Sequence, residues 1–424
     1  MRGQVEINID RVIVHLLCCY TFLIPLEKIL EVIFQIDTTL KPYRVLAILI
    51  IGCFIVRSFF RWTSNPELKQ DVFLYGIFLY GLIITLVRMI TVPFQLPLFL
   101  NDAFQISLYL GVFVVIRHVQ ITRNDITRMM KFLMAGILVN CLYFFNGFFF
   151  NQLYNRDGGF MDNPNYLALS AVVTILFLIT HYQSVKGLFK RLLMLLLVFF
   201  LGYIIILAGS RTSFVILIFC IGLMFYFSPG KARGALVTIF FLLSVFLTFG
   251  GWNIVESAGP VILANRLKKN SSTDNRVPIW KGALKGAESA NYIGLGIGQF
   301  KARFREFYQN ENNQLIHRVV RNDYFLSPHS DYLALLAIYG ALGLLGYLIF
   351  LFLTVKKALI KYITSVELDV RIYYQFGFLV LVSLILFGIT NENTISPLFW
   401  ILLTMSTRVN FLEIDNKQHV EAYE

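Results

Sequence analysis

Charged residues are scarce in this sequence of 424 residues: Asp, Glu, Lys and Arg together make up 15% of it. Apolar residues make up 57% and aromatic residues 16%, whereas a soluble globular domain is about half apolar. The apolar residues are spread over almost the whole length, which excludes an ordinary soluble protein. We therefore expect an all-α, polytopic membrane protein that forms a single transmembrane domain over residues 1–424.

Cysteine is rare as well, and all five cysteines fall inside apolar stretches: Cys18, Cys19, Cys53, Cys141 and Cys220. None has histidine at metal-binding spacing, so neither a disulfide framework nor a metal site is expected, and no cofactor is implied. The first residues, 1–11, lack the charged, apolar and cleavable pattern of a signal peptide. The first span is therefore expected to be retained. Tandem repeats are absent too, which weighs against a transporter built from inverted repeats.

What the sequence does contain is a series of long apolar segments. A helix needs roughly 20 mainly apolar residues to cross a membrane, and twelve segments come close to this length. They cover residues 12–30, 43–60, 72–92, 100–117, 129–150, 164–182, 189–208, 211–228, 234–252, 331–355, 372–390 and 395–411.

The basic residues of the short loops set the orientation, because Lys and Arg are biased toward the cytoplasm. They follow the even-numbered spans: Arg57, Arg61 and Lys69; Arg117, Arg123, Arg128 and Lys131; Lys186, Lys190 and Arg191; Lys231 and Arg233; Lys356, Lys357, Lys361 and Arg371. This pattern predicts that both termini are cytoplasmic and that residues 251–331 form a large extracytoplasmic loop. The net charge of +12 is largely topological and does not indicate nucleic acid.

The predicted loop 251–331 is itself basic, with 11 Lys and Arg against six Asp and Glu before Asp331. Loops of this length are exempt from the charge bias, so the excess needs another explanation. We expect short helices in this loop and a site for an anionic, lipid-linked ligand.

Arg211 lies where two apolar spans are separated by a short break at Gly209 and Ser210. A turn there places Arg211 in the first turn of the next helix, at the outer face, where the helix N-terminus adds free amides and a positive dipole. That combination favours an anion site. An arginine that extends to the outer lipid headgroups explains the residue equally well.

Arg276 and Trp280 lie four residues apart in the loop, at the start of a helix predicted over residues 277–289. Asp274 or Asn275 is a suitable N-cap, and Pro278 falls in the first turn. The planar guanidinium of Arg276 is able to hold two phosphate oxygens at once. Structural stacking of the arginine on Trp280 is the alternative.

His329 precedes Ser330, a plausible N-cap for the span that begins at Asp331. The positive helix end favours a neutral imidazole that is able to accept a proton, whereas Asp331 favours the charged form. A base at the outer mouth of the helix is one interpretation, and an ordinary polar interface residue is the other.

Polar turns on the same predicted face supply further candidates for binding sugar hydroxyls. Asn163 and Asn165 open the sixth span, and residues 391–393 (Asn-Glu-Asn) join the last two spans. The glycine run 294–298 lacks the preceding strand of a dinucleotide-binding fingerprint. It predicts instead a tight turn where the backbone comes close to other backbone or to a ligand.

Together these segments resemble the O-antigen ligase and polymerase superfamily of bacterial inner-membrane glycosyltransferases. The resemblance rests on the order and spacing of Asn163–Ala168, Gly209–Thr212, Asn275–Arg276 with Trp280, Gly294–Phe300, and His329–Leu333 followed by Tyr339–Gly340. It covers about residues 160–350. Where the family more often has asparagine after the histidine, this chain has Ser330.

The resemblance implies a metal-independent glycosyltransferase with an undecaprenyl diphosphate-linked glycan as its donor. Arg211 and Arg276 would bind the diphosphate, and His329 would be the general base. Asn163, Asn165, Trp280 and Asp331 are secondary candidates. The acceptor would be lipid A core for a ligase or a second lipid-linked glycan for a polymerase.

The single large loop favours the ligase. A protein oligosaccharyltransferase is a weaker option, because no sizeable domain follows the last span. A flippase or transporter of polar lipids is the competing class.

Overall fold

The computed structural model describes residues 2–34, 41–60, 71–91, 94–149, 158–161, 163–182, 184–227, 271–308 and 327–409. These residues form helices joined by turns, with one isolated bridge between Gly158 and Met161. The helices are α1 (Arg2–Leu23), η1 (Ile24–Leu26), α2 (Ile29–Phe34), α3 (Pro42–Phe60), α4 (Asp71–Thr91), α5 (Leu96–His118), α6 (Arg123–Phe149), α7 (Pro164–His181), α8 (Leu188–Leu207), α9 (Arg211–Phe227), α13 (Ser271–Ser289), α14 (Gln299–Tyr308), α16 (Asp331–Thr364), α17 (Leu368–Gly388) and α18 (Pro397–Val409).

Within these described ranges, nine helices are long and apolar enough to cross a membrane. They match predicted spans one to seven, ten and eleven. The eighth and twelfth spans occur as the shorter helices α9 and α18, of 17 and 13 residues. The ninth, 234–252, lies outside the described residues. The all-α polytopic class is therefore confirmed, and the total of twelve spans stays a prediction.

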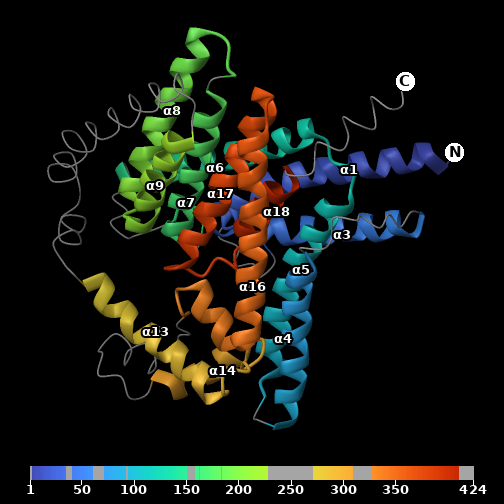
Figure 1. Ribbon diagram of the computed structural model, residues 1–424, viewed down its shortest axis with the longest axis vertical. Helices are drawn as coiled ribbons and strands as arrows, with labels where there is room; N and C mark the ends of the chain where they lie inside the picture. Colours follow the sequence, from blue (N-terminus) through green and yellow to red (C-terminus); the bar gives the residue numbers. More distant parts are fainter. Residues whose placement is uncertain are drawn as a thin grey trace.

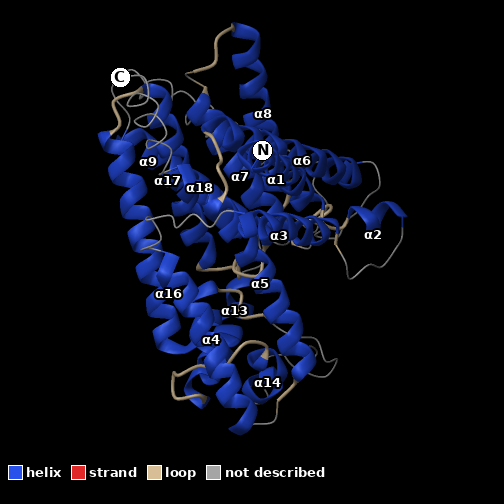
Figure 2. Ribbon diagram, turned by 90° about the vertical axis from the view of Figure 1, so that its right-hand side faces the viewer, coloured by secondary structure: helices blue, strands red, loops and turns tan. Residues whose placement is uncertain are grey.

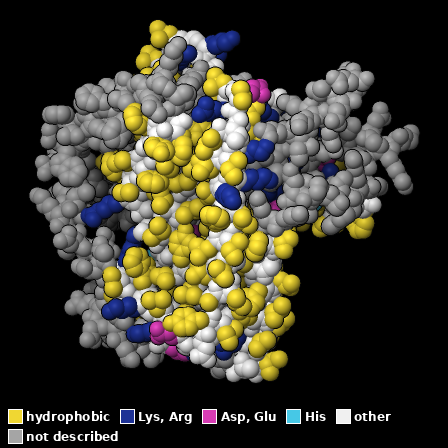
Figure 3. All heavy atoms as spheres, in the orientation of Figure 1, with side chains coloured by type: hydrophobic (Ala, Val, Ile, Leu, Met, Phe, Trp, Pro, Cys, Tyr) yellow, Lys and Arg dark blue, Asp and Glu magenta, His cyan; other side chains and the backbone are white. Residues whose placement is uncertain are grey.

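Apolar side chains cover the outside of the helices, as a lipid environment requires. In the face shown in Figure 3, yellow side chains run from the upper part of the molecule to its lower end, with Lys and Arg in the upper half and near the left and lower edges. Exposed apolar residues of the spans include Leu342, Leu345, Leu348 and Phe352 on α16 and Leu79, Ile83, Leu86 and Ile90 on α4. In water such a surface would be costly, so it supports the membrane assignment.

Helix α7 forms the centre of the bundle. Of its 18 residues, 16 are buried, and it packs against α6, α8, α9 and α17. A helix that is apolar on every side is stable when other helices surround it. Because its neighbours hold α7 in place, the start of α7 is a well-fixed contact for the neighbouring helix ends. By contrast, α1 and α3 lie side by side and run across the long axis (Figure 1).

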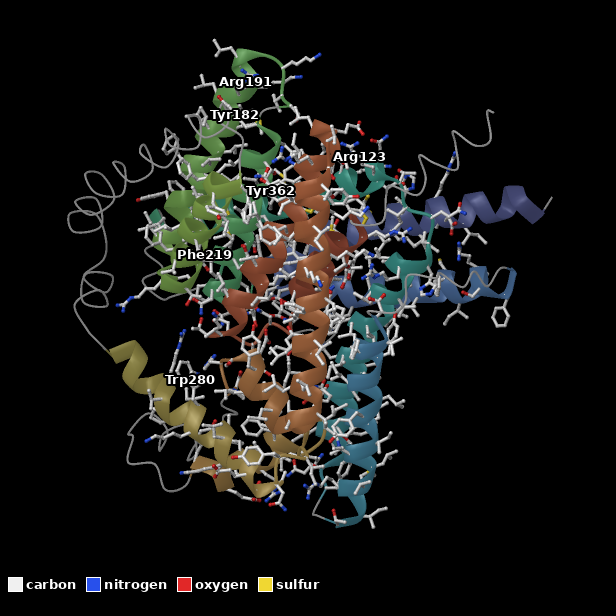
Figure 4. All side chains as sticks on the ribbon, in the orientation of Figure 1. Arg123, Tyr182, Arg191, Phe219, Trp280 and Tyr362 are labelled. Atoms are coloured by element: carbon white, nitrogen blue, oxygen red, sulfur yellow. The ribbon has the colours of Figure 1, made fainter. Side chains whose placement is uncertain are left out.

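The helix ends that carry the predicted cytoplasmic charges gather at one end of the bundle. Arg408 at the end of α18 donates to the backbone oxygen of Arg117 at the end of α5, at 3.1 Å. Arg371 in α17 donates to the oxygen of Phe227 at the end of α9, at 3.4 Å. Figure 4 shows the same grouping, with Trp280 in the lower part of the molecule and these residues in the upper part: Arg123, Tyr182, Arg191 and Tyr362.

Two of the arginines that were counted toward membrane orientation lie in buried ion pairs. Arg57 Nε is 2.5 Å from Asp10 Oδ1, and Arg117 Nη2 is 3.1 Å from Asp71 Oδ1. A buried charge is tolerated when it is paired, so these arginines link α1 to α3 and α4 to α5. The choice of the cytoplasmic side for this end of the bundle remains a prediction.

At the opposite end, α16 bends sharply at Gly340, whose φ is 68° and ψ is −172°. The bend separates a short arm, residues 331–339, from the long arm that begins at residue 341. The short arm, α13 and α14 enclose a small second core that includes Ala283, Phe300, Phe304 and Ala337. In Figures 1 and 2, α13 and α14 lie at the lower end of the molecule, together with part of α4.

Candidate functional site

The starts of α7, α9 and α16 meet at the turn formed by residues 390–394, which follows α17. Asn391, Glu392 and Asn393 are all buried in this turn. Each of the three helix starts makes at least one hydrogen bond to it, as described below. The 390–394 turn therefore connects segments that are up to 230 residues apart in the sequence.

The start of α7 is capped by Asn163, whose Oδ1 accepts a hydrogen bond from the backbone N–H of Asn165 at 2.9 Å. Asn165 is buried, and its Nδ2 donates to Asn391 Oδ1 at 3.0 Å. The hydroxyl of Tyr166 donates to the backbone oxygen of Glu392. Asn163 and Asn165, predicted as secondary ligands for sugar, thus have clear structural contacts in capping α7 and tying it to the turn.

Arg211 is the first residue of α9 and is exposed, as its position after Gly209 and Ser210 predicts. Gly209 has a φ of 63°, a conformation in which glycine is favoured, and it ends α8. The next residue, Thr212, shares a hydrogen bond of 2.9 Å with Thr390. Arg211 is therefore held next to the 390–394 turn by its neighbour in the sequence.

The start of α16 is anchored by Asp331, which is almost completely buried. Its Oδ1 accepts hydrogen bonds from the backbone N–H groups of Asn393, at 2.6 Å, and Thr394, at 3.0 Å. Its own N–H donates to the oxygen of Asn391 at 3.2 Å. Asp331, a secondary candidate, therefore fixes the turn against α16. Ser330 occupies the N-cap position, as predicted, but its side chain makes no capping hydrogen bond.

His329 is half-buried and has a φ of 49°. For a residue other than glycine this left-handed conformation costs on the order of 1–2 kcal/mol, and such residues cluster at functional sites. The N–H of His329 donates to Ser327 Oγ at 3.3 Å. The hydroxyl of Ser327 in turn donates to the Glu392 carboxylate. The backbone of His329 is thus attached to the turn through Ser327.

Glu392 belongs to the polar turn 391–393 that was predicted as a further candidate for binding sugar hydroxyls, but the sequence did not indicate its burial or its contacts. Burial raises the pKa of its carboxyl to about 7, and Asp102 raises it further, while the hydrogen bond from Ser327 and the charge of Lys301 lower it. A carboxyl group that titrates near neutrality beside a histidine segment is able to exchange protons. The contact of Glu392 with Ser327 could not be predicted from the sequence, because the two residues are 65 positions apart.

Arg276 and Trp280 lie on α13, which packs against α14 and α16. The helix begins at Ser271, so the prediction of an N-cap at Asp274 or Asn275 was wrong. Pro278 is accommodated inside the helix, although it removes a backbone hydrogen bond there. Arg276 is consequently one and a half turns into α13, and the helix N-terminus does not reinforce its charge.

The surroundings of Arg276 and Trp280 still suit an anion. Burial lowers the pKa of the half-buried Arg276 guanidinium, and this side chain has no hydrogen-bond or ion-pair partner among the residues that the structure describes. The Trp280 Nε1 donor is buried and also lacks a partner within that part of the chain. Figure 4 places Trp280 on α13, in the part of the molecule below α9. Stacking of Arg276 on Trp280 is not found between these described side chains.

The glycine run forms the tight turn that was predicted, and the structure shows what it approaches. Gly294, Gly296 and Gly298 have φ values of 115°, 95° and 75°. A Cβ at Gly294 would lie 2.7 Å from the oxygen of Ile338, and one at Gly298 would lie 2.8 Å from the backbone nitrogen of Phe99. The turn therefore packs backbone against backbone at the bend of α16 and the start of α5.

A cavity of about 300 Å³ lies beside Ser327, which is one of its lining residues. Helices α4, α5, α14 and α16 and the residues that follow α17 line it. Glu392, Ser327, Asp102 and Lys301 are among its lining residues, whereas Arg211, Arg276, Trp280 and His329 are not. The cavity lining thus includes neither the predicted donor ligands nor the predicted base.

Residues 195–348 match the family described as O-antigen ligase. The predicted resemblance to the O-antigen ligase and polymerase superfamily is therefore confirmed. The matched segment includes Arg211, Arg276 and His329, and it excludes Asn163, Asn165 and Glu392. A comparison with curated proteins finds no match. The match supports a glycosyltransferase-like activity of the ligase or polymerase kind, and the apolar helices indicate a multi-pass membrane protein.

Proposed function

We propose that this protein is an O-antigen ligase-type glycosyltransferase, which moves a glycan from an undecaprenyl diphosphate carrier to a lipid A core acceptor. The observation that carries the proposal is the meeting of α9 and α16 at the 390–394 turn, in a chain whose residues 195–348 match the ligase family. This meeting brings the start of Arg211's helix and the segment of His329 together. The reaction would take place at the outer face of the bacterial inner membrane, with the loop 251–331 in the periplasm and both termini in the cytoplasm.

Arg211 and Arg276 would bind the two phosphates of the donor. Arg211 is exposed at a helix N-terminus, where free amides and the helix dipole favour an anion. Arg276 is partly desolvated, so a phosphate there would interact with it more strongly than in water. Their charges would stabilise the negative charge that develops on the leaving diphosphate. Trp280 Nε1, buried without a partner in the described structure, is a further donor for a phosphate oxygen.

His329 would act as the general base. The acceptor oxygen forms a bond to the anomeric carbon of the donor sugar, while the bond from that carbon to the phosphate oxygen breaks. The electron pair leaves with the diphosphate, and the acceptor proton passes to the imidazole of His329. The left-handed backbone at His329 sets the direction of this side chain. We propose no metal or cofactor for this step.

Two alternatives use the same cationic groups. A polymerase would pass the growing glycan to a second lipid-linked repeat. The single large loop predicted between spans nine and ten favours the ligase over this alternative. A flippase of polar lipids would bind the donor without transferring the glycan, and the strained base candidate next to a cationic region favours an enzyme over this class.

The test is expression of wild-type, His329→Ala, Arg211→Ala and Arg276→Ala proteins in ligase-null and polymerase-null hosts. Lipopolysaccharide is then separated on a gel, and each variant's level in the membrane is measured by immunoblot. We expect the wild type to restore capping of lipid A core in the ligase-null host, and each variant to fail at equal protein level. Restoration of the ladder in the polymerase-null host would indicate the polymerase. Normal transfer by His329→Ala would refute the assigned role of the histidine.

A further inference from the structure

The cavity next to His329 combines a hydrocarbon-like wall with a polar end. Its apolar wall comes from membrane-spanning helices, with Ile77 on α4, Ile106 on α5 and Leu335 on α16. Its polar end is formed by Asp102, Lys301 and Glu392. The volume of about 300 Å³ lies within the range of ligand pockets in proteins. Such a cavity suits an amphiphile, with its chain among the helices and its polar group at the 390–394 turn.

The charges at the polar end determine which polar group fits. Glu392 is buried and Asp102 is half-buried, so two carboxyl groups line the cavity against the single amine of Lys301. Asp102 and the ionised form of Glu392 repel a phosphate, whereas both carboxyl groups accept hydrogen bonds from hydroxyl groups. Asn101 donates to Asp102 Oδ1 at 3.2 Å, and Gln105 is oriented by its bond to the Ile395 oxygen at 3.0 Å. The groups that contact Asp102 and Glu392 are therefore expected to be sugar hydroxyls, with any phosphate of the ligand placed away from these two carboxyl groups.

The link to His329 places this end of the cavity near the proposed base. Ser327 lines the cavity, donates to Glu392 and accepts from the N–H of His329. A hydroxyl group bound at Glu392 would therefore lie next to Ser327, and His329 follows Ser327 by two residues. The arginines proposed for the donor lie on α9 and α13, which do not line the cavity.

We infer that this cavity is the binding site for the acceptor, a membrane-anchored glycolipid whose sugar hydroxyls are held by Glu392 and Asp102. The role of this ligand as the acceptor rests on the proposed function. The binding of a glycolipid in the cavity does not depend on it. Lipid A core and a second lipid-linked glycan both carry sugar hydroxyls on a hydrocarbon anchor, so the experiment must distinguish them. Glu392 has two roles in this arrangement, since it binds the acceptor and holds the Ser327–His329 segment.

The first experiment measures binding directly, with protein in lipid nanodiscs and dodecyl maltoside that carries a photoreactive diazirine on its alkyl chain. We expect labelling of peptides from α4, α5 and α16. Unlabelled dodecyl maltoside should compete, and dodecyl phosphate should not. Ile106→Trp, which fills the cavity, should reduce labelling at least about fivefold, as expected for a lost apolar contact of 1 kcal/mol or more. Phe104→Trp, at an exposed position of the same helix, is the matched control and should leave labelling unchanged.

Competition with natural glycolipids then identifies the source of the acceptor. Displacement by lipid A core, or by a diphosphate-linked repeat, supports the site and names which of the two occupies it. Failure of both to compete would overturn the inference, as would stronger competition by dodecyl phosphate than by the maltoside. Equal labelling of the Ile106→Trp and wild-type proteins would also overturn it.

The second experiment measures glycan transfer with separate titrations of donor and acceptor. Asp102→Asn should raise the KM for acceptor about tenfold, as the loss of a charged hydrogen bond does, with the KM for donor unchanged. Glu306→Gln, at an exposed residue of α14, is the control. An unchanged acceptor KM in Asp102→Asn would contradict the assignment. Absence of transfer by wild-type protein that still shows the expected labelling would refute the proposed function and leave the binding site intact.

Discussion

The predicted donor ligands and the lining of the cavity differ in the sign of their charge and in their surroundings. The cationic region consists of the two predicted donor ligands, Arg211 on α9 and Arg276 on α13, and both side chains are at least partly open to solvent. The acidic region has Glu392 and Asp102 in a cavity between apolar helices. The proposed transfer between two lipid-anchored substrates needs two sites, because cations stabilise a diphosphate leaving group, whereas hydrogen-bond acceptors and donors bind a neutral sugar. Under this proposal, the difference in charge assigns the donor to the cationic region and the acceptor to the acidic region.

Reversal of the charge in the cationic region should have the largest effect. Arg276→Glu places a carboxylate where the diphosphate is proposed to bind, and we expect kcat/KM to fall at least about 1,000-fold, comparable with the loss of a main electrostatic stabiliser. Arg276→Lys keeps the charge without the planar fork and should lose about tenfold. Transfer rates in nanodiscs measure both effects, with Arg305→Glu, at an exposed residue of α14, as the control. Equal activity of the Glu and Lys variants would remove the arginine from the donor site.

Loss of the hydrogen bonds between Asp331 and the 390–394 turn should lower the stability of the fold and weaken both proposed sites. Asp331→Ala removes the acceptor of two backbone hydrogen bonds, at 2.6 and 3.0 Å, and leaves a buried N–H at Asn393 and a partly buried N–H at Thr394 unsatisfied. We expect a loss of about 2–4 kcal/mol and a clearly lower melting temperature for the purified protein. Donor and acceptor binding should both weaken. A variant with unchanged melting temperature and normal binding of both substrates would show that the turn does not depend on Asp331.

Titration of the acidic region should affect the acceptor alone. The pKa of Glu392 is raised to about 7, chiefly by burial, so its carboxylate forms as the pH rises through 7. We expect wild-type kcat/KM for acceptor to rise several-fold between pH 6 and pH 8. Glu392→Gln should lack this rise and should have an acceptor KM about tenfold higher.

The same pKa has a consequence for stability with the opposite sign. Because the pKa of Glu392 is higher in the folded protein than the ordinary value of 4.5, the folded state gains stability from the bound proton below pH 4.5. That contribution is lost as the pH rises through 7. Melting temperatures of wild-type and Glu392→Gln proteins from pH 5 to pH 8 should therefore converge toward low pH. A wild-type protein that becomes relatively more stable with rising pH would contradict the raised pKa.

The smallest effect is expected at the link between α9 and the turn. Thr212→Val removes the hydrogen bond of 2.9 Å to Thr390 and conserves the shape of the side chain. We expect a loss of about 0.5–1.5 kcal/mol and a KM for donor two- to fivefold higher, with the KM for acceptor unchanged. Thr127→Val, at the opposite end of the bundle, is the matched control. A shift in the acceptor KM in place of the donor KM would reverse the assignment of α9 to the cationic region.

The sequence predicted local features well, because they depend on neighbouring residues. Gly209 and Ser210 correctly placed Arg211 at a helix start, and the apolar segments correctly gave most of the helices. The predicted start of α13 was wrong, because Asp274, Asn275 and Pro278 are all typical of a helix start, whereas the helix begins at Ser271. The contacts of Glu392 with Ser327 and of Asn165 with Asn391 could not be predicted, because 65 and 226 residues separate the partners. The crosswise direction of α1 and α3 (Figure 1) was also beyond prediction, since hydropathy gives the length of a helix and not its angle.

The 390–394 turn also determines when the protein becomes competent during its biosynthesis. Ribosomes deliver the chain from its N-terminus, so Arg211, Arg276 and His329 are all translated before the turn that contacts the starts of α9 and α16. A nascent chain that ends before residue 390 contains these three side chains but not the contacts of Asn391, Glu392 and Asn393. Assembly of the proposed site therefore waits for the insertion of the last helices.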